Sequence, residues 1–530
     1  MAGWRYAFAL SKEEVKQAAP LGTVALIENH EKINPDVEEL QSEETIRFPK
    51  PSSDPADPLN WALWRKVALL LVSALYAFVS NFNSSVMAPA LQLWPKAFPH
   101  DPRSFSQLPY LVGTNVLFLG LSNILWVPLS NALGRRPVLL AATLLCTLCT
   151  MWCGLATSFD SLLAARMFQG MGGGAAETVS PALIGEIFFV DERGRAMAVY
   201  TIFLCAGSLV GGVSGGYLAY EHGWAYPFWV SLALTGATFL GHLFLVPETL
   251  YDRESPSADE VLLEDATKNS VAHQEHVQAA APEHNHRPYT FIRSLGFIQP
   301  PGGVVRSFLQ PWRTLRLPGT WVVMSHYGGL VGGVVTISTI SPQILAMPPY
   351  LWGSNVGLIN VGALVGTVLG AAYTYAVSDA WLKRQAKHRR QGFAEAEDRL
   401  PLMFPALCIA TCGFFVFGFT GPNAGAKGWV GLQVGFGMVS FGLMQVPSIG
   451  FNYLIDAYSY AAGDCFVMVT SLRAILAFTW TLVVGDWYAD RGLAEPFGIF
   501  GMLMGIFSLL TVPLWLFGKR MRIATASVLE

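Results

Sequence analysis

Long apolar runs limit what this chain can fold into. Runs of roughly twenty residues recur along the 530-residue sequence, and a helix of that length crosses a hydrocarbon core of about 30 Å. The predicted spans are 67–87, 108–128, 137–157, 162–185, 196–218, 227–247, 320–341, 351–377, 402–420, 428–450, 464–486 and 496–517. The pattern therefore predicts an all-α membrane protein with twelve transmembrane helices.

The composition agrees with a membrane protein and excludes several other classes. The chain is 52% hydrophobic and only 13% charged, against roughly 25% charged residues in soluble domains. A net charge of -3 argues against a nucleic-acid partner, which would require a basic surface. Cys146, Cys149 and Cys153 lie in one apolar run, so we expect packing residues rather than disulfides or a metal site.

A polar segment divides the spans into two sets of six. We expect two pseudo-symmetric six-helix bundles, 67–247 and 320–517, joined by a cytosolic linker at 248–319. Residues 1–66 are predicted to be a disordered cytosolic tail, and 518–530 a second cytosolic tail. Four histidines of the linker lack the spacing of a metal site, so a solvated loop is favoured over metal binding or regulation.

The basic residues predict the orientation. With the amino terminus inside, the inner loops and tail hold Arg135, Arg136, Arg193, Arg195, Lys383, Arg384, Lys387, Arg389, Arg390, Arg399, Lys519, Arg520 and Arg522. The outer loops hold only Lys96, Arg103, Lys427 and Arg491. Because basic residues concentrate on the cytosolic side of membranes, both termini are expected in the cytosol.

The fourth span contains two ionisable residues. Arg166 and Glu177 are eleven residues apart, so they share a helix face about 16 Å apart, and Gln169 lies on the same face. A charge at bilayer depth costs at least about 2.5–3.5 kcal/mol, so each residue needs a partner on another helix, in water or in a substrate. The glycines at 170 and 172–174 allow a backbone or a ligand to approach this helix closely.

Polar residues in other spans are further candidates for a substrate or proton-coupling site. They are Asn81, Asn83, His326, Asn452, Tyr453 and Arg473. Arg473 lies roughly 15 Å into its helix and is predicted to act near the midplane, with structural pairing as the alternative. His326 is a candidate proton relay or, as an isolated histidine more often is, a packing residue. Asn83 begins a glycosylation sequon that we expect to be inaccessible within its span.

The loop after the second span, V-P-L-S-N-A-L-G-R-R-P, resembles the signature between helices two and three of the major facilitator superfamily. Gly134, Arg135 and Arg136 match that signature, whereas Asn131 stands where an acidic residue is usual. The resemblance implies a gating loop that latches the two halves on the cytosolic side.

Two glycine-rich spans resemble the same family. A-A-R-M-F-Q-G-M-G is similar to its helix-four signature, which implies proton coupling at Arg166. G-S-L-V-G-G-V-S-G-G resembles the antiporter signature of helix five, with Gly207, Gly211, Gly215 and Gly216 matching and Gly212 in place of a proline. Glycines four apart also allow close helix packing in any transporter, so the sequence leaves open whether these glycines indicate antiport or packing alone.

Other stretches are similar to fungal members near the drug:proton antiporters and the polyamine or cation transporters. They are D-P-L-N-W, D-E-R-G-R-A, V-P-E-T-L-Y-D-R and N-Y-L-I-D-A-Y. The resemblance implies export of drugs, toxins or secondary metabolites, with import of polyamines or other organic cations as an alternative. A nutrient sensor on the same scaffold is a third alternative, from a different class.

No enzyme motif competes with transport. The sequence has no phosphate-binding Gly-Lys-Ser/Thr loop, nucleophile elbow or pair of zinc ligands, so we expect neither an enzyme nor ATP-driven transport by this chain. We expect no cofactor or metal, with a proton gradient as the energy source. The expected partners are a small-molecule substrate, protons and the lipid bilayer, and the chain is expected to be a monomer in the plasma membrane.

Overall fold

The computed structural model describes residues 7–8, 23–25, 57–104, 106–250, 304–389, 393–421, 427–458 and 461–529. Long helices dominate these residues. In the first half they are α3 (Leu63–Ser85), α5 (Tyr110–Leu121), α6 (Asn123–Leu133), α7 (Arg135–Leu155), α8 (Phe159–Ile187), α9 (Val190–His222) and α10 (Tyr226–Leu245). In the second half they are α13 (Pro318–Ala346), α14 (Asn360–Arg389), α15 (Met403–Thr420), α16 (Trp429–Leu443), α18 (Ala462–Arg491) and α19 (Ala494–Leu509).

These helices form the twelve predicted spans. Ten spans in the described residues are long and apolar enough to cross a membrane, with α5 and α6 counted as one. The eleventh is α8, whose 29 residues include the polar stretch around Arg166 and Glu177. The twelfth begins with the shorter α16 and continues through η7 (Val446–Gly450) and α17 (Phe451–Ala457).

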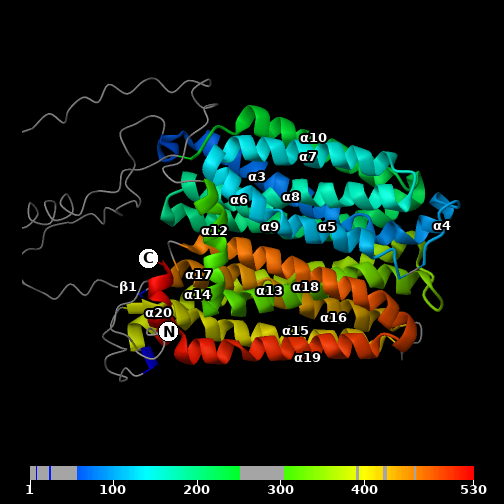
Figure 1. Ribbon diagram of the computed structural model, residues 1–530. Helices are drawn as coiled ribbons and strands as arrows, with labels where there is room; N and C mark the ends of the chain where they lie inside the picture. The colour runs from blue at the N-terminus through cyan, green and yellow to red at the C-terminus, as the bar shows by residue number, and fades with distance from the viewer. Residues whose placement is uncertain are drawn as a thin grey trace, which may run out of the picture.

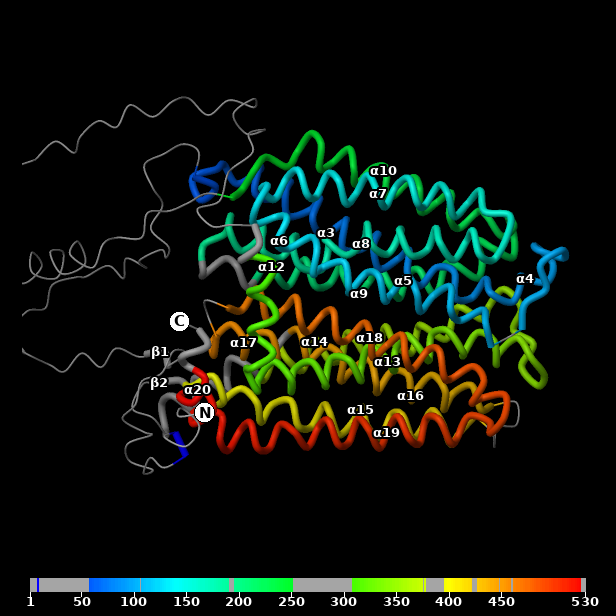
Figure 2. Tube along the Cα trace, in the orientation of Figure 1, coloured from blue at the N-terminus to red at the C-terminus, as the bar shows by residue number. Residues whose placement is uncertain are grey.

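The spans form two layers of nearly parallel helices (Figures 1 and 2). Helices α3 to α10 pack with one another in the first bundle, and α13 to α19 do so in the second. The bundles meet where α5 packs on α18 and where α9 packs on α14. Each bundle therefore has its own core, and a long interface runs between the two.

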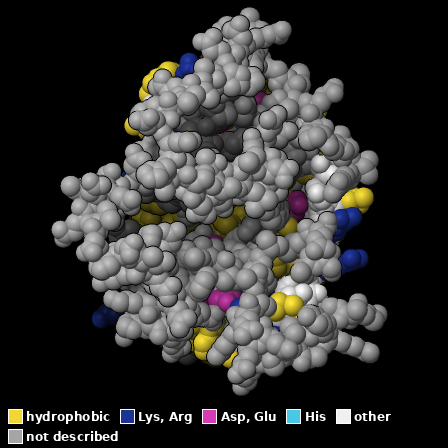
Figure 3. All heavy atoms as spheres, turned by 90° about the vertical axis from the view of Figure 1, so that its left-hand side faces the viewer, with side chains coloured by type: hydrophobic (Ala, Val, Ile, Leu, Met, Phe, Trp, Pro, Cys, Tyr) yellow, Lys and Arg dark blue, Asp and Glu magenta, His cyan; other side chains and the backbone are white. Residues whose placement is uncertain are grey.

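Both ends of the described chain lie at one end of the bundles, which we call the terminal end (Figure 1). Short elements occupy the ends of the spans: η1 (Pro58–Asn60), η2 (Ala88–Leu93), α4 (Trp94–Ala97), α12 (Val304–Arg313), η4 (Thr314–Arg316), η5 (Gly353–Ile359), η6 (Ala396–Leu402) and α20 (Thr511–Leu529). Strands β1 (Thr23–Ala25) and β2 (Phe393–Glu395) form a two-stranded antiparallel sheet. Figure 3 looks onto the terminal end.

The described part of the amino-terminal tail differs from our prediction of disorder. Strand β1 pairs with β2, with Thr23 opposite Glu395 and Ala25 opposite Phe393. Farther towards the amino terminus, Arg520 Nη1 donates a hydrogen bond of 3.0 Å to the carbonyl of Phe8. These residues find backbone partners in the second bundle, which the composition of the tail did not reveal. The rest of the predicted tail up to residue 56 lies outside the described residues.

Two other predicted polar segments also contain structure. Helix α20 continues through 518–529, where buried Arg522 donates hydrogen bonds of 2.7–2.8 Å to Glu397 and of 2.7 Å to Glu395. Lys519 adds a 2.7 Å ion pair to Glu395. Within the predicted linker, α12 and η4 are helical, and residues 251–303 lie outside the described residues. Lys519 and Arg522, which we predicted to lie in a solvated tail, thus stabilise the terminal end of the second bundle.

The helix-five glycines bring two helices into close contact. A Cβ built on Gly211 would lie 2.8 Å from the carbonyl oxygen of Phe82 in α3. Gly207 faces the carbonyl of Phe78 in α3 in the same way, and Gly215 faces that of Val86, the residue after α3. Gly216 faces Ser354 of η5, at 2.9 Å, in the second bundle. Helix α9 therefore uses its glycines for contact with both bundles, whatever the direction of transport.

This packing predicts a difference between two glycine substitutions. Gly211→Ala forces a methyl group against the α3 backbone and should cost about 1–3 kcal/mol, as overpacking does. Gly236→Ala in α10 is the control, because nothing lies within 4 Å of its added Cβ. The melting temperature of the purified protein should fall for Gly211→Ala and stay level or rise for Gly236→Ala. Equal melting temperatures would contradict the close contact.

Candidate functional site

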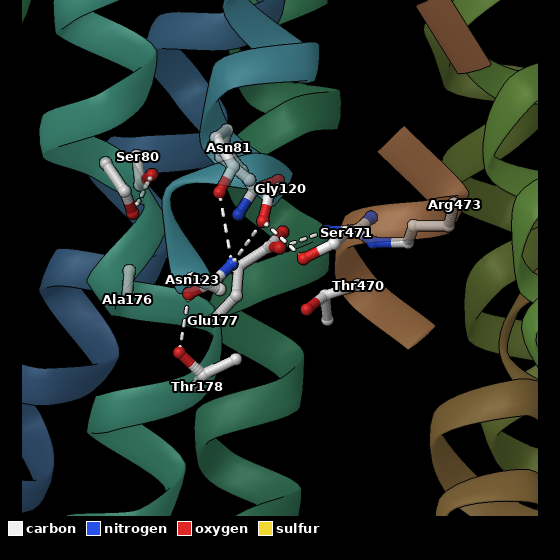
Figure 4. Close-up of polar contacts among 12 residues, drawn as sticks. Ser80, Asn81, Gly120, Asn123, Ala176, Glu177, Thr178, Thr470, Ser471 and Arg473 are labelled. Carbon is white, nitrogen blue, oxygen red and sulfur yellow. Dashed lines mark hydrogen bonds and ion pairs between the residues drawn. The ribbon is translucent and has the colours of Figure 1, made fainter. Parts of the chain in front are cut away.

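A buried ion pair joins the two bundles. Glu177 of α8 and Arg473 of α18 form a salt bridge through Oε2 and Nη2, and only 6% and 7% of their side chains are exposed. Glu177 lies ten residues before the end of α8, about 15 Å from the terminal end. Figure 4 shows the two side chains extending toward each other across the interface. Each charge thus has its counter-charge on the opposite bundle.

Further contacts surround this pair. The guanidinium of Arg473 lies 4.6 Å from the ring centroid of Tyr327 in α13, a distance suited to a cation–π interaction. Ser471, two residues earlier in α18, shares its hydroxyl hydrogen between the carbonyl of Val467 in its own helix, at 2.7 Å, and the carbonyl of Gly120 in α5, at 3.2 Å. The two bundles are therefore joined here by one ion pair and one neutral hydrogen bond.

The first bundle positions its side of the interface through an asparagine. Asn123 begins α6 and donates 3.1 Å hydrogen bonds to the carbonyls of Leu119 and Gly120 at the end of α5. Its Oδ1 accepts a 2.5 Å hydrogen bond from Thr178, the neighbour of Glu177 (Figure 4). This chain of contacts connects Thr178, the residue after Glu177, to the carbonyl of Gly120, which also faces Ser471.

Arg166 has no contact with Glu177 and lies wholly inside the first bundle. Its Nη1 donates to the carbonyl of Asn83 at 2.7 Å and to Gln169 Oε1 at 2.6 Å. Its Nη2 donates to the carbonyl of Ser84 at 3.1 Å, and its Nε donates to that of Leu111 at 3.1 Å. The described partners of this cation are therefore neutral oxygens.

These contacts make Arg166 a cap for α3. Asn83 and Ser84 belong to the last turn of α3, where carbonyls lack partners within the helix and the helix dipole favours a cation. Gln169 is fixed in turn by Thr150, whose hydroxyl accepts from Nε2 at 2.8 Å. The network holds the point at which α3 gives way to η2.

The opposite end of the interface is also closed by hydrogen bonds. Gln92 of η2 donates to the carbonyl of Pro342 in α13 and accepts a 3.0 Å hydrogen bond from Tyr220 of α9. Tyr217 donates to Asn355 Oδ1 at 2.7 Å. Because η2 follows the turn that Arg166 caps, this arginine positions one contact between the bundles without touching the other bundle.

The other predicted site residues lie apart from the ion pair. His326 is buried, with Nε2 2.9 Å from the carbonyl of Phe507 and 3.2 Å from Thr511 Oγ1. Tyr453 is buried beside Tyr458, with its ring next to Gly319, and Asn452 precedes it in α17. Asn81 is half-buried in α3 and donates to Ala77 at 3.1 Å. The structure thus does not gather the predicted residues into one site.

The predicted gating loop contacts its own bundle. Arg135 Nη2 pairs with Glu186 at 2.9 Å, and its Nη1 donates to Asn131 Oδ1 at 2.5 Å. Asn131 therefore supplies a neutral acceptor in the position where the family usually has an acid. These partners lie in α6 and α8, so the latch between halves that the resemblance implies stays a prediction.

A carboxylate caps the helix that follows this loop. Glu248 accepts hydrogen bonds from the backbone N–H groups of Arg135 and Arg136, at 2.9 and 3.1 Å, at the start of α7. Gly134 adopts φ +102°, and a Cβ there would clash with the Glu248 carboxylate. Burial raises the pKa of Glu248. The hydrogen bonds from the backbone favour the ionised form and lower this pKa, but burial has the larger effect.

Sequence reasoning missed several of these residues. Glu186, Glu248 and Ser471 were not candidates, although the V-P-E-T-L stretch carries Glu248 and Ser471 stands two residues before Arg473. Spacing along one helix reveals a shared face, whereas these contacts join residues more than fifty positions apart.

Comparison with known proteins identifies the family. The profile of the Major Facilitator Superfamily matches residues 70–480. The chain belongs to this superfamily. It is therefore an integral, multi-pass membrane protein of a family of transporters.

Individual relatives agree with this assignment. The chain is 27% identical to the MFS transporter cpaT of Aspergillus oryzae, over 89% of this chain and 90% of that protein. It is 24% identical to the efflux pump radE of Floropilus chiversii, over 88% and 83%. A crystal structure of a D-xylose-proton symporter matches with a TM-score of 0.54 and 16% identity, over 85% and 96%. This structural likeness confirms the predicted twelve-helix fold.

The ion pair predicts strong coupling between two substitutions. Glu177→Gln or Arg473→Met leaves one buried charge without its partner, which typically costs about 3–5 kcal/mol, whereas replacing both removes both charges. The melting temperature of the double variant should therefore lie well above the value expected from adding the two single losses. Asp456 and Arg399, a 2.9 Å pair whose side chains are 29% and 24% exposed, provide the control cycle with weak coupling. Coupling no larger than in that control would contradict a buried pair.

Arg166 makes a second prediction that separates charge from hydrogen bonding. Arg166→Lys keeps the cation but cannot span carbonyls on two helices, and each buried acceptor left unpaired costs about 1–3 kcal/mol. Arg166→Lys and Arg166→Gln should therefore lower the melting temperature to a similar extent. The exposed Arg195, changed to lysine, is the control. Full stability of the lysine variant would show that charge alone matters.

Proposed function

We propose that this chain is a proton-coupled antiporter that exports small organic molecules, such as drugs, toxins or secondary metabolites, from the cytosol across the plasma membrane. The observation that carries this proposal is the buried Glu177–Arg473 pair between the bundles. Carriers of this architecture work by rocking two bundles around a central site, so a contact between bundles must break and re-form in every cycle.

Protonation provides a way to break this contact. A proton that binds to the carboxylate of Glu177 removes its negative charge and leaves Arg473 without a counter-ion. Arg473 keeps its charge at any physiological pH and retains the ring of Tyr327. The weakened interface then opens at the terminal end, which we propose faces the cytosol. Loss of the proton restores the pair and closes that end.

The name of one relative and the charge of Glu177 bear on the direction of transport and on the class of substrate. The name of radE, an efflux pump, favours export. The Glu177 carboxylate favours the second candidate, import of polyamines or other organic cations, because a cation could replace Arg473 as its partner. We propose a monomer, since each bundle contributes one member of the pair within a single chain. Neither candidate requires a cofactor or metal.

Substrate-dependent proton movement in proteoliposomes tests the proposal. Wild-type protein should move protons when a compound from a panel of cationic and neutral organic molecules is added to one side. Glu177→Gln keeps the shape of the side chain without a titratable group and should reduce proton-coupled transport at least tenfold. The exposed Glu221, changed to glutamine, is the control and should transport normally.

Each other outcome identifies a different function. Transport without proton movement would refute proton coupling. Preference for uptake of cations, lost in Glu177→Gln, would favour the importer. Specific binding of a nutrient without transport would identify a sensor.

A further inference from the structure

Helix α12 lies across the spans instead of along them. It runs over the terminal end of the bundles and continues through η4 into α13, which starts at Pro318 (Figure 1). It contacts α6 of the first bundle and α18 of the second. Helix α18 carries Arg473 of the buried ion pair, and α6 packs on α8, which carries Glu177. Helix α12 therefore bridges the two bundles near their terminal end.

The two sides of this segment differ in chemistry. Pro311 and Thr314 are buried, and the Thr314 hydroxyl donates a 2.6 Å hydrogen bond to the carbonyl of Pro311. Leu309 and Trp312 are 58% and 51% exposed. Arg313 and Arg316 are exposed as well, and neither forms an ion pair with any residue that the structure describes.

The four exposed residues share one face. Positions 309, 312, 313 and 316 follow the i, i+3, i+4, i+7 spacing of one helix side. A leucine and a tryptophan beside two arginines suit the membrane interface, where apolar side chains reach the acyl boundary and long arginine side chains extend their charged groups to the phosphates. Figure 3 shows basic side chains at the right-hand edge of this end of the molecule.

Other tryptophans place α12 at the level of the interface. Trp321, in the first turn of α13, is 47% exposed and donates a 2.7 Å hydrogen bond to the carbonyl of Leu315. Trp64, at the start of α3, is also exposed and has Arg65 5.4 Å from its ring. Tryptophans concentrate where hydrocarbon meets headgroups, so η4 and the exposed side of α12 lie at this boundary.

We propose that the exposed face formed by α12 and the following η4 binds the headgroups of anionic phospholipids. Leu309 and Trp312 enter the acyl boundary, and the guanidinium groups of Arg313 and Arg316 bind lipid phosphates and carboxylates. Neither arginine has an acidic partner among the described residues, which favours an anionic ligand, and their position at membrane level favours a lipid over a soluble protein. Because α12 contacts both bundles, the bound lipid would hold this bridge over their interface. This surface is separate from the transport site.

Lipid binding can be measured without any transport substrate. The full chain in detergent is titrated with fluorescent phosphatidylserine, with phosphatidylcholine as the zwitterionic comparison. A basic residue near a charged membrane surface contributes roughly fivefold in affinity, so Arg313→Gln/Arg316→Gln should weaken phosphatidylserine binding more than tenfold. The matched control is Arg195→Gln/Arg491→Gln, which removes two exposed arginines elsewhere and should stay within twofold of wild type. Equal binding by the α12 variant, or equal binding of both lipids by wild type, would overturn the proposal.

A depth measurement provides the second arm. In bilayers of bromine-labelled lipid, replacing Trp312 with Phe should remove a strongly quenched part of the tryptophan fluorescence, because the indole lies at the acyl boundary. If the fluorescence that Trp312→Phe removes is not quenched by the brominated lipid, the indole lies in water. That result would exclude lipid binding at this face and favour a protein partner. Both measurements are independent of proton coupling, so failure of the proposed function leaves them interpretable.

Discussion

A charge inside a membrane protein must find its partner within the protein, because hydrocarbon supplies none. In this chain that requirement connects the two halves. Glu177 and Arg473 lie on different bundles, and each is buried only as long as the bundles stay together at this position. The cost of separating them is therefore part of the energy of opening the interface. An event that neutralises the carboxylate changes that energy directly, which is what a coupled transporter needs.

Arg166 shows another solution to the same requirement. Backbone carbonyls at the end of α3 and the amide oxygen of Gln169 solvate this cation, and all of them belong to the first bundle. In the proposed mechanism, rocking of the bundles would leave these contacts intact. The two buried arginines therefore differ in their partners: Arg473 pairs across the interface between the bundles, and Arg166 holds elements of one bundle together.

The terminal end uses charged residues for a third purpose. Glu248 caps α7, and Arg522 ties α20 to β2 through Glu395 and to η6 through Glu397. These contacts organise each bundle separately, whereas α12 touches both. The terminal end therefore contains both contacts that act within one bundle and an element that joins the two.

The sequence by itself determined the membrane fold, because apolar runs of spanning length leave the backbone no stable alternative to helices in hydrocarbon. It also identified Arg166, Glu177 and Arg473 as residues that need partners, since a charge within a span is visible without coordinates. Only the tertiary structure decided which partners they have. Pairing Glu177 with a residue almost three hundred positions away depends on how two separate bundles pack, and no helical period encodes that. The strand at 23–25 and the helical 518–529 were likewise missed, because their partners, residues 393–397, lie more than a hundred positions away.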